Sequence, residues 1–247
     1  MNDVTEQNQE LVLANDQLPA HLQDRMGDDR GNEAVGGDDL TIPRIELCQS
    51  LSKCRKKSDP AYIEGIEEGM FYNNITRGIY GTSVTVVPVF YQKEFLLWRD
   101  QDLGGGFGGA FPNMVEAEAA LAELEKPEEY EVVPTNQQFV LVLTSDGKVE
   151  EAVISMAKSK NKVSRDWNSL IRLSGGPRFA KAYVLTGVEA QNQQNQDFYN
   201  MTVRAAGFVS EKVFKQAEEV YALITSGAVA VDRTIDGEIV EDDDAEM

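Results

Sequence analysis

The chain contains little of the chemistry on which most catalytic and metal sites depend. Its 247 residues include one histidine, His21, and two cysteines, Cys48 and Cys54. Ser-His-Asp and Cys-His nucleophilic sites need a histidine, and His21 lies in a polar N-terminal segment. One histidine and two cysteines also fall short of the four ligands of an ordinary zinc site, and two cysteines are too few for a disulfide scaffold. We therefore expect a protein that is not an enzyme, holds no metal or other cofactor, and keeps its cysteines as small residues in a reducing compartment.

Long apolar segments and phosphate-binding loops are also missing. No stretch approaches the ~18 apolar residues of a membrane-spanning helix, and residues 1–30 lack the basic start and apolar centre of a secretory signal. The glycine-rich segment 104–112, GGGFGGAFP, lacks the Lys-Ser/Thr pair of a P-loop. The expected location is the cytoplasm, with no membrane partner.

Acidic residues outnumber basic ones by 42 to 23, but the excess lies at the two ends of the chain. Residues 1–40 carry a net charge of −8 and residues 232–247 carry −7, which leaves −4 between them. Residues 1–40 are also polar and poor in aromatic side chains, a composition typical of disorder. We predict a flexible acidic arm over 1–40, one folded domain over 41–231 and a flexible acidic tail over 232–247. The net acidity does not argue against a nucleic-acid partner.

The hydrophobic pattern predicts mostly strands. They are expected at 41–47, at 69–75, in two runs of 83–99 that form a hairpin around Gln92–Glu94, in a hairpin of 137–144 and 148–157, and at 178–190 and 198–209. Asp146-Gly147 supplies the turn of the second hairpin, and Pro88 predicts an edge or a bulge. Segment 104–112 is expected to be a flexible loop.

Three helices are expected between and after these strands. Asn113, with Glu116 as its capping-box partner, begins the first; Ser164 begins the second, which ends at Gly175; and Ser210 begins the third, which ends at Gly227. This order excludes a regular βα alternation and a helical bundle. The sequence predicts an α+β, mostly β fold: an OB-like antiparallel barrel with additional strands and helices. An OB-fold likewise has a helix between its third and fourth strands.

Basic residues concentrate in residues 158–181, which carry a local charge of +6. Lysines and arginines that neutralise phosphates gain affinity from the release of counterions. The candidate phosphate-binding residues are Lys158, Lys160, Lys162, Arg165, Arg172, Arg178 and Lys181. A secondary basic loop contains Lys53, Arg55, Lys56 and Lys57.

Aromatic residues interleave with these basic segments, as single-strand binding requires. The base-stacking candidates are Trp98, Phe107, Trp167 and Tyr199. An alternative interpretation is that 158–181 is a solvated surface beside a helix whose Trp167, Leu170 and Ile171 form core. The sequence alone leaves both interpretations open.

The acidic tail VDRTIDGEIVEDDDAEM has two interpretations as well. It is either a solvated end without a specific role, or a tethered polyanion that competes with DNA for the basic surface and is released for partner proteins.

The segments SMAKSKNKVSRDWNSLIRLSGGPRF, YVLTGVEAQNQQNQDFYNMTV and GFVSEKVFKQAEEVY, followed by the acidic tail, resemble bacteriophage single-stranded DNA-binding proteins built on an OB-fold. The resemblance covers residues 41–247 in layout. It implies a protein that coats single-stranded DNA in phage DNA replication and recombination, in the host cytoplasm. It also implies that the acidic C-terminus contacts phage or host replication and recombination proteins. Homo-oligomer formation is compatible with the sequence.

A second hypothesis comes from another class of protein. The net charge of −19 suits an acidic DNA mimic that presents carboxylates to a host enzyme and inhibits it. A mimic needs its acids on a rigid surface, however, whereas here they concentrate in the predicted flexible ends.

Overall fold

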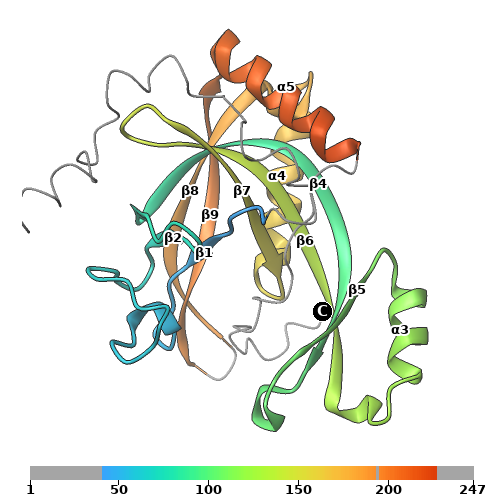
Figure 1. Cartoon of the computed structure of the whole chain (residues 1–247). Helices are drawn as coiled ribbons and strands as arrows, with labels where there is room; N and C mark the ends of the chain where they lie inside the picture. Colours follow the sequence, from blue (N-terminus) through green and yellow to red (C-terminus); the bar gives the residue numbers. More distant parts are fainter. Residues whose placement is uncertain (1–40, 193–194, 227–247) are drawn as a thin grey trace, which may run out of the picture. The chain divides into compact units, whose positions relative to one another are not determined.

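Two antiparallel sheets and three α-helices make up the part of the chain that the computed structural model describes, residues 41–192 and 195–226 (Figure 1). All these residues belong to one compact unit. The predicted acidic arm 1–40, the acidic tail 232–247 and the predicted helix end at Gly227 lie outside the described residues.

The larger sheet has the strand order β7-β6-β4-β8-β9, and β5 pairs with β4. Its strands are β4 (Ser83–Arg99), β5 (Phe107–Phe111), β6 (Tyr130–Leu143), β7 (Val149–Ala157), β8 (Lys181–Gln191) and β9 (Asp197–Phe208). The smaller sheet consists of β1 (Ile45–Leu47), β2 (Phe71–Asn73) and β3 (Ile79–Gly81). The helices are α3 (Met114–Ala122), α4 (Lys160–Ser174) and α5 (Glu211–Thr225). The mostly β, antiparallel character predicted from the sequence is confirmed.

The predicted barrel does not close. Among the described residues, no ladder joins edge strands β7 and β9. The smaller sheet and its flanking residues contact both edges instead. Arg44 pairs in parallel with Val153 of β7, and the Gln49 side chain bonds to the backbone of Tyr199 on β9. The predicted barrel is therefore not closed, and another part of the chain contacts each of the two edges.

A close backbone approach also joins the two sheets. A Cβ at Gly187 of β8 would overlap the carbonyl oxygen of Gly69, just before β2. Glycine at position 187 therefore permits this contact.

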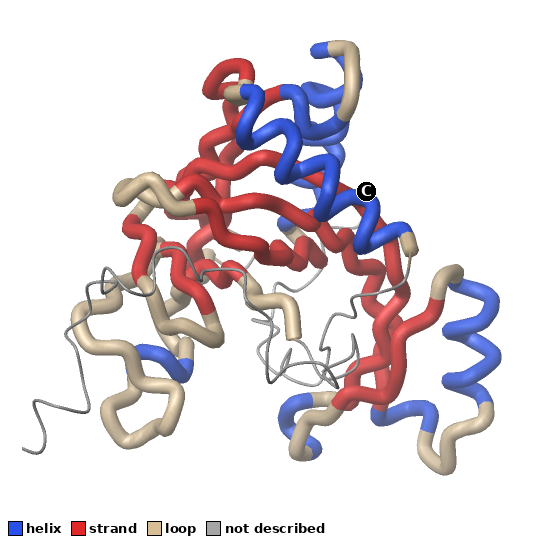
Figure 2. Tube along the Cα trace, turned by 45° about the horizontal axis from the view of Figure 1, so that its top comes forward, coloured by secondary structure: helices blue, strands red, loops and turns tan. Residues whose placement is uncertain are grey.

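Helices α4 and α5 cover opposite faces of the larger sheet. Trp167 of α4 packs in the main core with Val86, whereas Ala217 of α5 packs in a second cluster with Val87. Successive residues of a strand point to opposite faces, so Val86 and Val87 assign the two helices to different sides. Figure 2 shows α5 lying across the strands of its side.

The long strand β4 replaces the hairpin that we predicted around Gln92–Glu94. It pairs continuously with β6 from Thr85 to Arg99, apart from a bulge between Pro88 and Phe90. Its ladder with β8 covers only Ser83 to Val86, so Pro88 lies beyond the β8 ladder. The predicted bulge is confirmed. The polar residues Gln92–Glu94 do not form a turn, because Glu94 is buried in mid-strand against β6.

Two other local predictions were wrong. Part of the expected glycine loop is strand β5, which pairs with β4 through Phe107–Phe111. Helix α4 begins at Lys160 rather than at Ser164, whose hydroxyl is buried and accepts a hydrogen bond from Gln138.

The local turn and cap signals were confirmed. Asn113 Oδ1 accepts a hydrogen bond from the backbone N–H of Glu116 at 3.0 Å, and its Nδ2 donates to Glu116 Oε1 at 2.7 Å. Ser210 Oγ accepts from the N–H of Val213 at the start of α5. Gly147 has a φ of 82°, as the turn between β6 and β7 requires.

Candidate functional site

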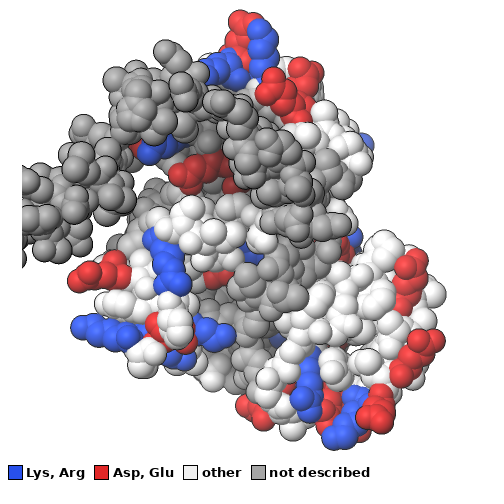
Figure 3. Space-filling view, in the orientation of Figure 1, with Lys and Arg blue, Asp and Glu red and all other residues white. Residues whose placement is uncertain are grey.

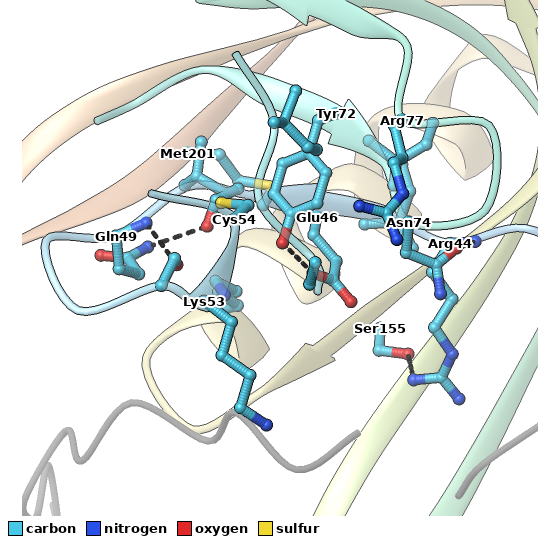
Figure 4. A pocket seen from close by; sticks show the side chains of 17 residues that line it. Arg44, Glu46, Gln49, Lys53, Cys54, Tyr72, Asn74, Arg77, Ser155 and Met201 are labelled. Atoms are coloured by element: carbon cyan, nitrogen blue, oxygen red, sulfur yellow. Dashed lines mark hydrogen bonds between the residues drawn. The ribbon is translucent and has the colours of Figure 1, made fainter. Parts of the chain in front are cut away.

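A pocket of about 220 Å³ lies between β1, the β1–β2 loop (residues 48–70), β7 and the start of α4 (Figure 4). Four cationic side chains line it: Arg44, Lys53, Arg77 and Lys160. Among the described lining residues, Glu46 is the one acid. Lys53 belongs to the predicted secondary basic loop and Lys160 to the main basic segment. The fold thus brings two distant basic segments to one cavity.

Hydrogen bonds hold two of these cations in place. Arg44 is 3% exposed, and its Nη1 donates to Ser155 Oγ at 3.2 Å. Ser155 Oγ donates in turn to Gln137 Oε1 at 2.7 Å. Arg77 Nη1 donates to the carbonyl oxygen of Pro60 at 2.6 Å. Guanidinium groups fixed in this way lose less conformational freedom when they bind an anion.

Tyr72 and Glu46 form a polar pair in the pocket wall. The Tyr72 hydroxyl donates to Glu46 Oε2 (Figure 4). Burial, together with the nearby Glu46 carboxylate, raises the pKa of Tyr72 far above its usual value. Tyr72 therefore remains a neutral donor, and Glu46 a carboxylate with further acceptor capacity.

The two cysteines lie beside this pair. Both are buried in a small cluster with Tyr72 without forming a disulfide, and their Sγ atoms are 3.6 Å apart. The hydrogen bond with Cys54 and burial raise the pKa of Cys48. The sequence left open whether Cys48 and Cys54 approach each other. They lie close together, and they do not form a disulfide.

Helix α4 presents a basic stripe to solvent. Lys162, Arg165 and Arg172 are exposed and follow an i, i+3, i+10 spacing, which places them on one side of the helix. Trp167 and Ile171 on the opposite side are buried in the core. The expected core position is therefore confirmed for Trp167 and Ile171 but wrong for Leu170, which is 37% exposed.

Arg178 lies inside the protein rather than on this stripe. Its Nη2 donates to Gln138 Oε1 and, at 2.8 Å, to Asn168 Oδ1, and its guanidinium lies 5.5 Å from the centroid of the Tyr91 ring. Desolvation by burial lowers the pKa of Arg178 to about 10. These contacts give Arg178 a role in joining α4 to the sheet.

Lys158 and Lys181 also have contacts within the chain. Lys158 Nζ lies 3.6 Å from Glu131 Oε2, and Lys181 Nζ lies 4.7 Å from the centroid of the Phe208 ring. The Phe208 side chain is 78% exposed at the end of β9. The half-buried Lys181 and the exposed Phe208 thus form a pair of a cation and an aromatic ring.

In the secondary basic loop, Arg55 is held by an ion pair with Glu68 and by a hydrogen bond to the Ser50 carbonyl at 2.8 Å. Lys56 and Lys57 are exposed. Figure 3 shows basic side chains over the β1–β2 loop, on the left of the view, interspersed with acidic ones.

The predicted stacking residues differ in exposure. Trp167 has no exposed surface and makes an edge contact with Tyr183, with ring centroids 5.9 Å apart. Trp98 is 7% exposed and packs against the half-buried Phe107 at 5.2 Å. Tyr199 is half-buried and donates from its hydroxyl to a carboxylate on β8. These rings pack within the fold, and both tryptophans are covered in this conformation.

Sequence reasoning missed Arg44, Arg77 and Phe208. Arg44 lies between the apolar residues of the segment TIPRIEL, and this position could have indicated a buried cation. Arg77 lies in a turn with a φ of 61°, and Phe208 follows the small residues 205–207. Their importance comes from tertiary placement, which the local pattern does not encode.

Within residues 41–192 and 195–226, no group of three or more His, Cys, Asp and Glu side chains is arranged to hold a metal ion. None of the helices described is long and apolar enough to span a membrane.

The described fold and pocket define a mostly antiparallel β protein with a cation-lined cavity beside its larger sheet. A family model described as "Pam3 phage gp34-like protein" matches residues 7–230. The chain therefore belongs to this phage protein family. Searches of curated proteins and of solved structures gave no match.

Proposed function

We propose that the protein is a non-catalytic single-stranded DNA-binding protein that acts in phage DNA replication and recombination, in the host cytoplasm. The observation that carries this proposal is the meeting of Lys53 and Lys160, from two distant basic segments, at one pocket. The exposed Lys56 and Lys57 follow Lys53 in the chain, and the α4 stripe starts two residues after Lys160. A strand that neutralises these cations releases counterions, which favours binding.

The order of the strands supports the same function. Strands β4, β6 and β7 are neighbours in the sheet, with β5 and α3 between β4 and β6 in the chain. Helix α4 comes after β7, and β8 returns to pair with β4 before β9. An OB-fold has five strands with a helix after the third, and its surface commonly binds oligonucleotides. We propose that the domain is an open OB-like fold in which the three-stranded sheet lies between β7 and β9.

An exposed aromatic ring supplies the second requirement of single-strand binding. Bases stack on aromatic side chains largely irrespective of sequence. Phe208, beside Lys181, combines a ring and a cation on the surface. In this proposal Phe208 joins the stacking candidates, while Trp98 and Trp167 support the fold.

The acidic tail 232–247 has a regulatory role in the proposal. As a tethered polyanion it competes with DNA for the basic residues, and on release it contacts phage or host replication and recombination proteins. A protein ending at Val231 is therefore expected to bind a single strand more tightly than the full chain, most clearly at low salt.

Fluorescence anisotropy of a labelled oligo-dT across several salt concentrations tests the function. The variant Lys162→Gln/Arg165→Gln/Arg172→Gln should bind more weakly, and the slope of log K against log salt should fall by about 2, because each lost single-strand phosphate contact removes about 0.7. The matched control is Lys148→Gln/Lys212→Gln/Lys215→Gln, three exposed lysines away from α4, which should change neither quantity.

Two results would contradict the proposal at different levels. Unchanged binding by the folded α4 variant would overturn the assignment of the stripe. No binding of single strands by the wild-type chain at low salt, with a duplex tested in parallel, would overturn the function itself.

A further inference from the structure

The cation-lined pocket has a size that limits its ligand. Its volume is about 220 Å³. Pockets for drug-sized ligands measure about 300–1,000 Å³. The cavity therefore suits one phosphate group with part of the attached sugar rather than several nucleotides.

The pocket also has a closed apolar side. Ile45, Leu47, Ile154 and Met201 contribute to its lining, and all four belong to the buried main core. A continuous strand needs space to enter and to leave on both sides of each phosphate. Because packed core residues close one side of the pocket, it suits the end of a strand rather than a segment that passes through.

The polar lining matches a phosphate monoester. Figure 4 shows Lys53 on one side of the pocket and Arg44 with Arg77 on the other, with Tyr72 and Glu46 between them. A terminal phosphate carries close to two negative charges at neutral pH, whereas an internal phosphodiester carries one. Several cations around one small cavity therefore favour binding of a terminal phosphate over an internal one.

The hydroxyl and amide groups of the lining complete this chemistry. Ser52 and Asn74 supply a hydroxyl and an amide group for the phosphate oxygens. Glu46, the one acid among the described lining residues, accepts the hydrogen bond of the Tyr72 hydroxyl.

We propose that this pocket binds the phosphorylated end of a DNA single strand, a phosphate monoester held among Arg44, Lys53, Arg77 and Lys160. The proposal rests on the single-stranded DNA binding proposed above and deepens it, because it gives the protein a preferred position on the strand. Internal phosphates contact the α4 stripe, and the terminal phosphate enters the pocket.

The test is competition against an internally labelled oligo-dT by unlabelled strands of equal length. The competitors carry a 5′-phosphate, a 3′-phosphate or hydroxyls at both ends, and dTMP and inorganic phosphate serve as free monoester and free anion. We expect one phosphorylated end to compete about tenfold better than the hydroxyl strand. The Lys53→Gln/Lys160→Gln variant should bind every strand more weakly and should lose this preference, so that phosphorylated and hydroxyl strands compete equally.

The control variant Lys212→Gln/Lys215→Gln carries the same charge change on α5 and should keep the preference. Retention of the preference in the pocket variant would overturn the proposal. Equal competition by all three strands with the wild-type chain would overturn it too, while leaving single-strand binding intact.

Failure of the function gives a different pattern. One such result is that no strand binds, but dTMP raises the melting temperature of the wild-type chain and not that of the pocket variant. This result would overturn both the strand-end assignment and the proposed function. If dTMP competes as well as a phosphorylated strand, the pocket recognises a free nucleotide and the strand-end assignment is overturned.

Discussion

The side-chain amide of Gln49 forms hydrogen bonds with both the backbone carbonyl and the backbone N–H of Tyr199. Gln49 Nε2 donates to the Tyr199 carbonyl oxygen at 2.8 Å, and Gln49 Oε1 accepts from the Tyr199 N–H at 2.8 Å. A side-chain amide here makes the two hydrogen bonds that a neighbouring strand would make. It satisfies part of the β9 edge where the predicted barrel would have closed.

Replacement of Gln49 by Met should therefore destabilise the fold. The thioether keeps a similar volume but leaves a backbone donor and acceptor without these bonds, which costs about 1–3 kcal/mol. Urea denaturation followed by circular dichroism measures the change.

The matched control is Gln191→Met, because Gln191 is exposed and bonds to Asp197 at the surface. It should change stability by no more than about 0.5 kcal/mol. Equal effects of the two substitutions would show that the Gln49 contact adds nothing to stability.

Trp167 should be the most stability-sensitive residue of α4. It is fully buried in the main core, so Trp167→Ala should cost about 3–5 kcal/mol. Its indole N–H is buried without a hydrogen-bond partner, so Trp167→Phe removes an unsatisfied donor and should cost clearly less.

Leu173→Ala on the same helix is the control, since Leu173 is 84% exposed. Thermal unfolding of the three variants ranks them. A loss for Leu173→Ala as large as that for Trp167→Ala would contradict the burial order of the helix.

These residues show which features of the fold could be predicted from the sequence and which could not. Turn and cap signals at Asn113, Gly147 and Ser210 are local, so the sequence predicted them correctly. The continuity of β4 and the open edge of the sheet depend on partners distant in the chain, and no local signal encoded them. The spacing in α4 indicated a basic helix, but only the fold separates its exposed stripe from Arg178, which follows the helix and is half-buried against it.

Phe208→Ala should weaken single-strand binding with little loss of stability. The ring is 78% exposed, and one stacked base contributes about 1–3 kcal/mol, which corresponds to roughly five- to 150-fold in affinity. Anisotropy titration with oligo-dT measures the loss, and thermal unfolding checks the fold. Phe208→Trp should retain binding, whereas unchanged affinity of Phe208→Ala would remove this residue from the interface.

The thiols of Cys48 and Cys54 should resist modification in the native state. Both are buried, and the raised pKa of Cys48 lowers its thiolate fraction. A disulfide-exchange reagent at neutral pH should label neither until denaturant is added. Rapid labelling of the native chain would mean that the β1–β2 loop opens readily.

Tyr80 should ionise at a higher pH than an ordinary tyrosine. Burial, together with the hydrogen bond that its hydroxyl donates to Glu150 at 2.7 Å, raises the pKa of Tyr80 to about 12. The ordinary tyrosine pKa is about 10. The folded state therefore favours the neutral phenol, so the stabilisation is complete below about pH 10 and is lost as the pH rises toward 12. Ultraviolet absorbance of the phenolate, compared between wild type and Tyr80→Phe, should differ by one group that ionises near pH 12, and a difference centred near pH 10 would contradict it.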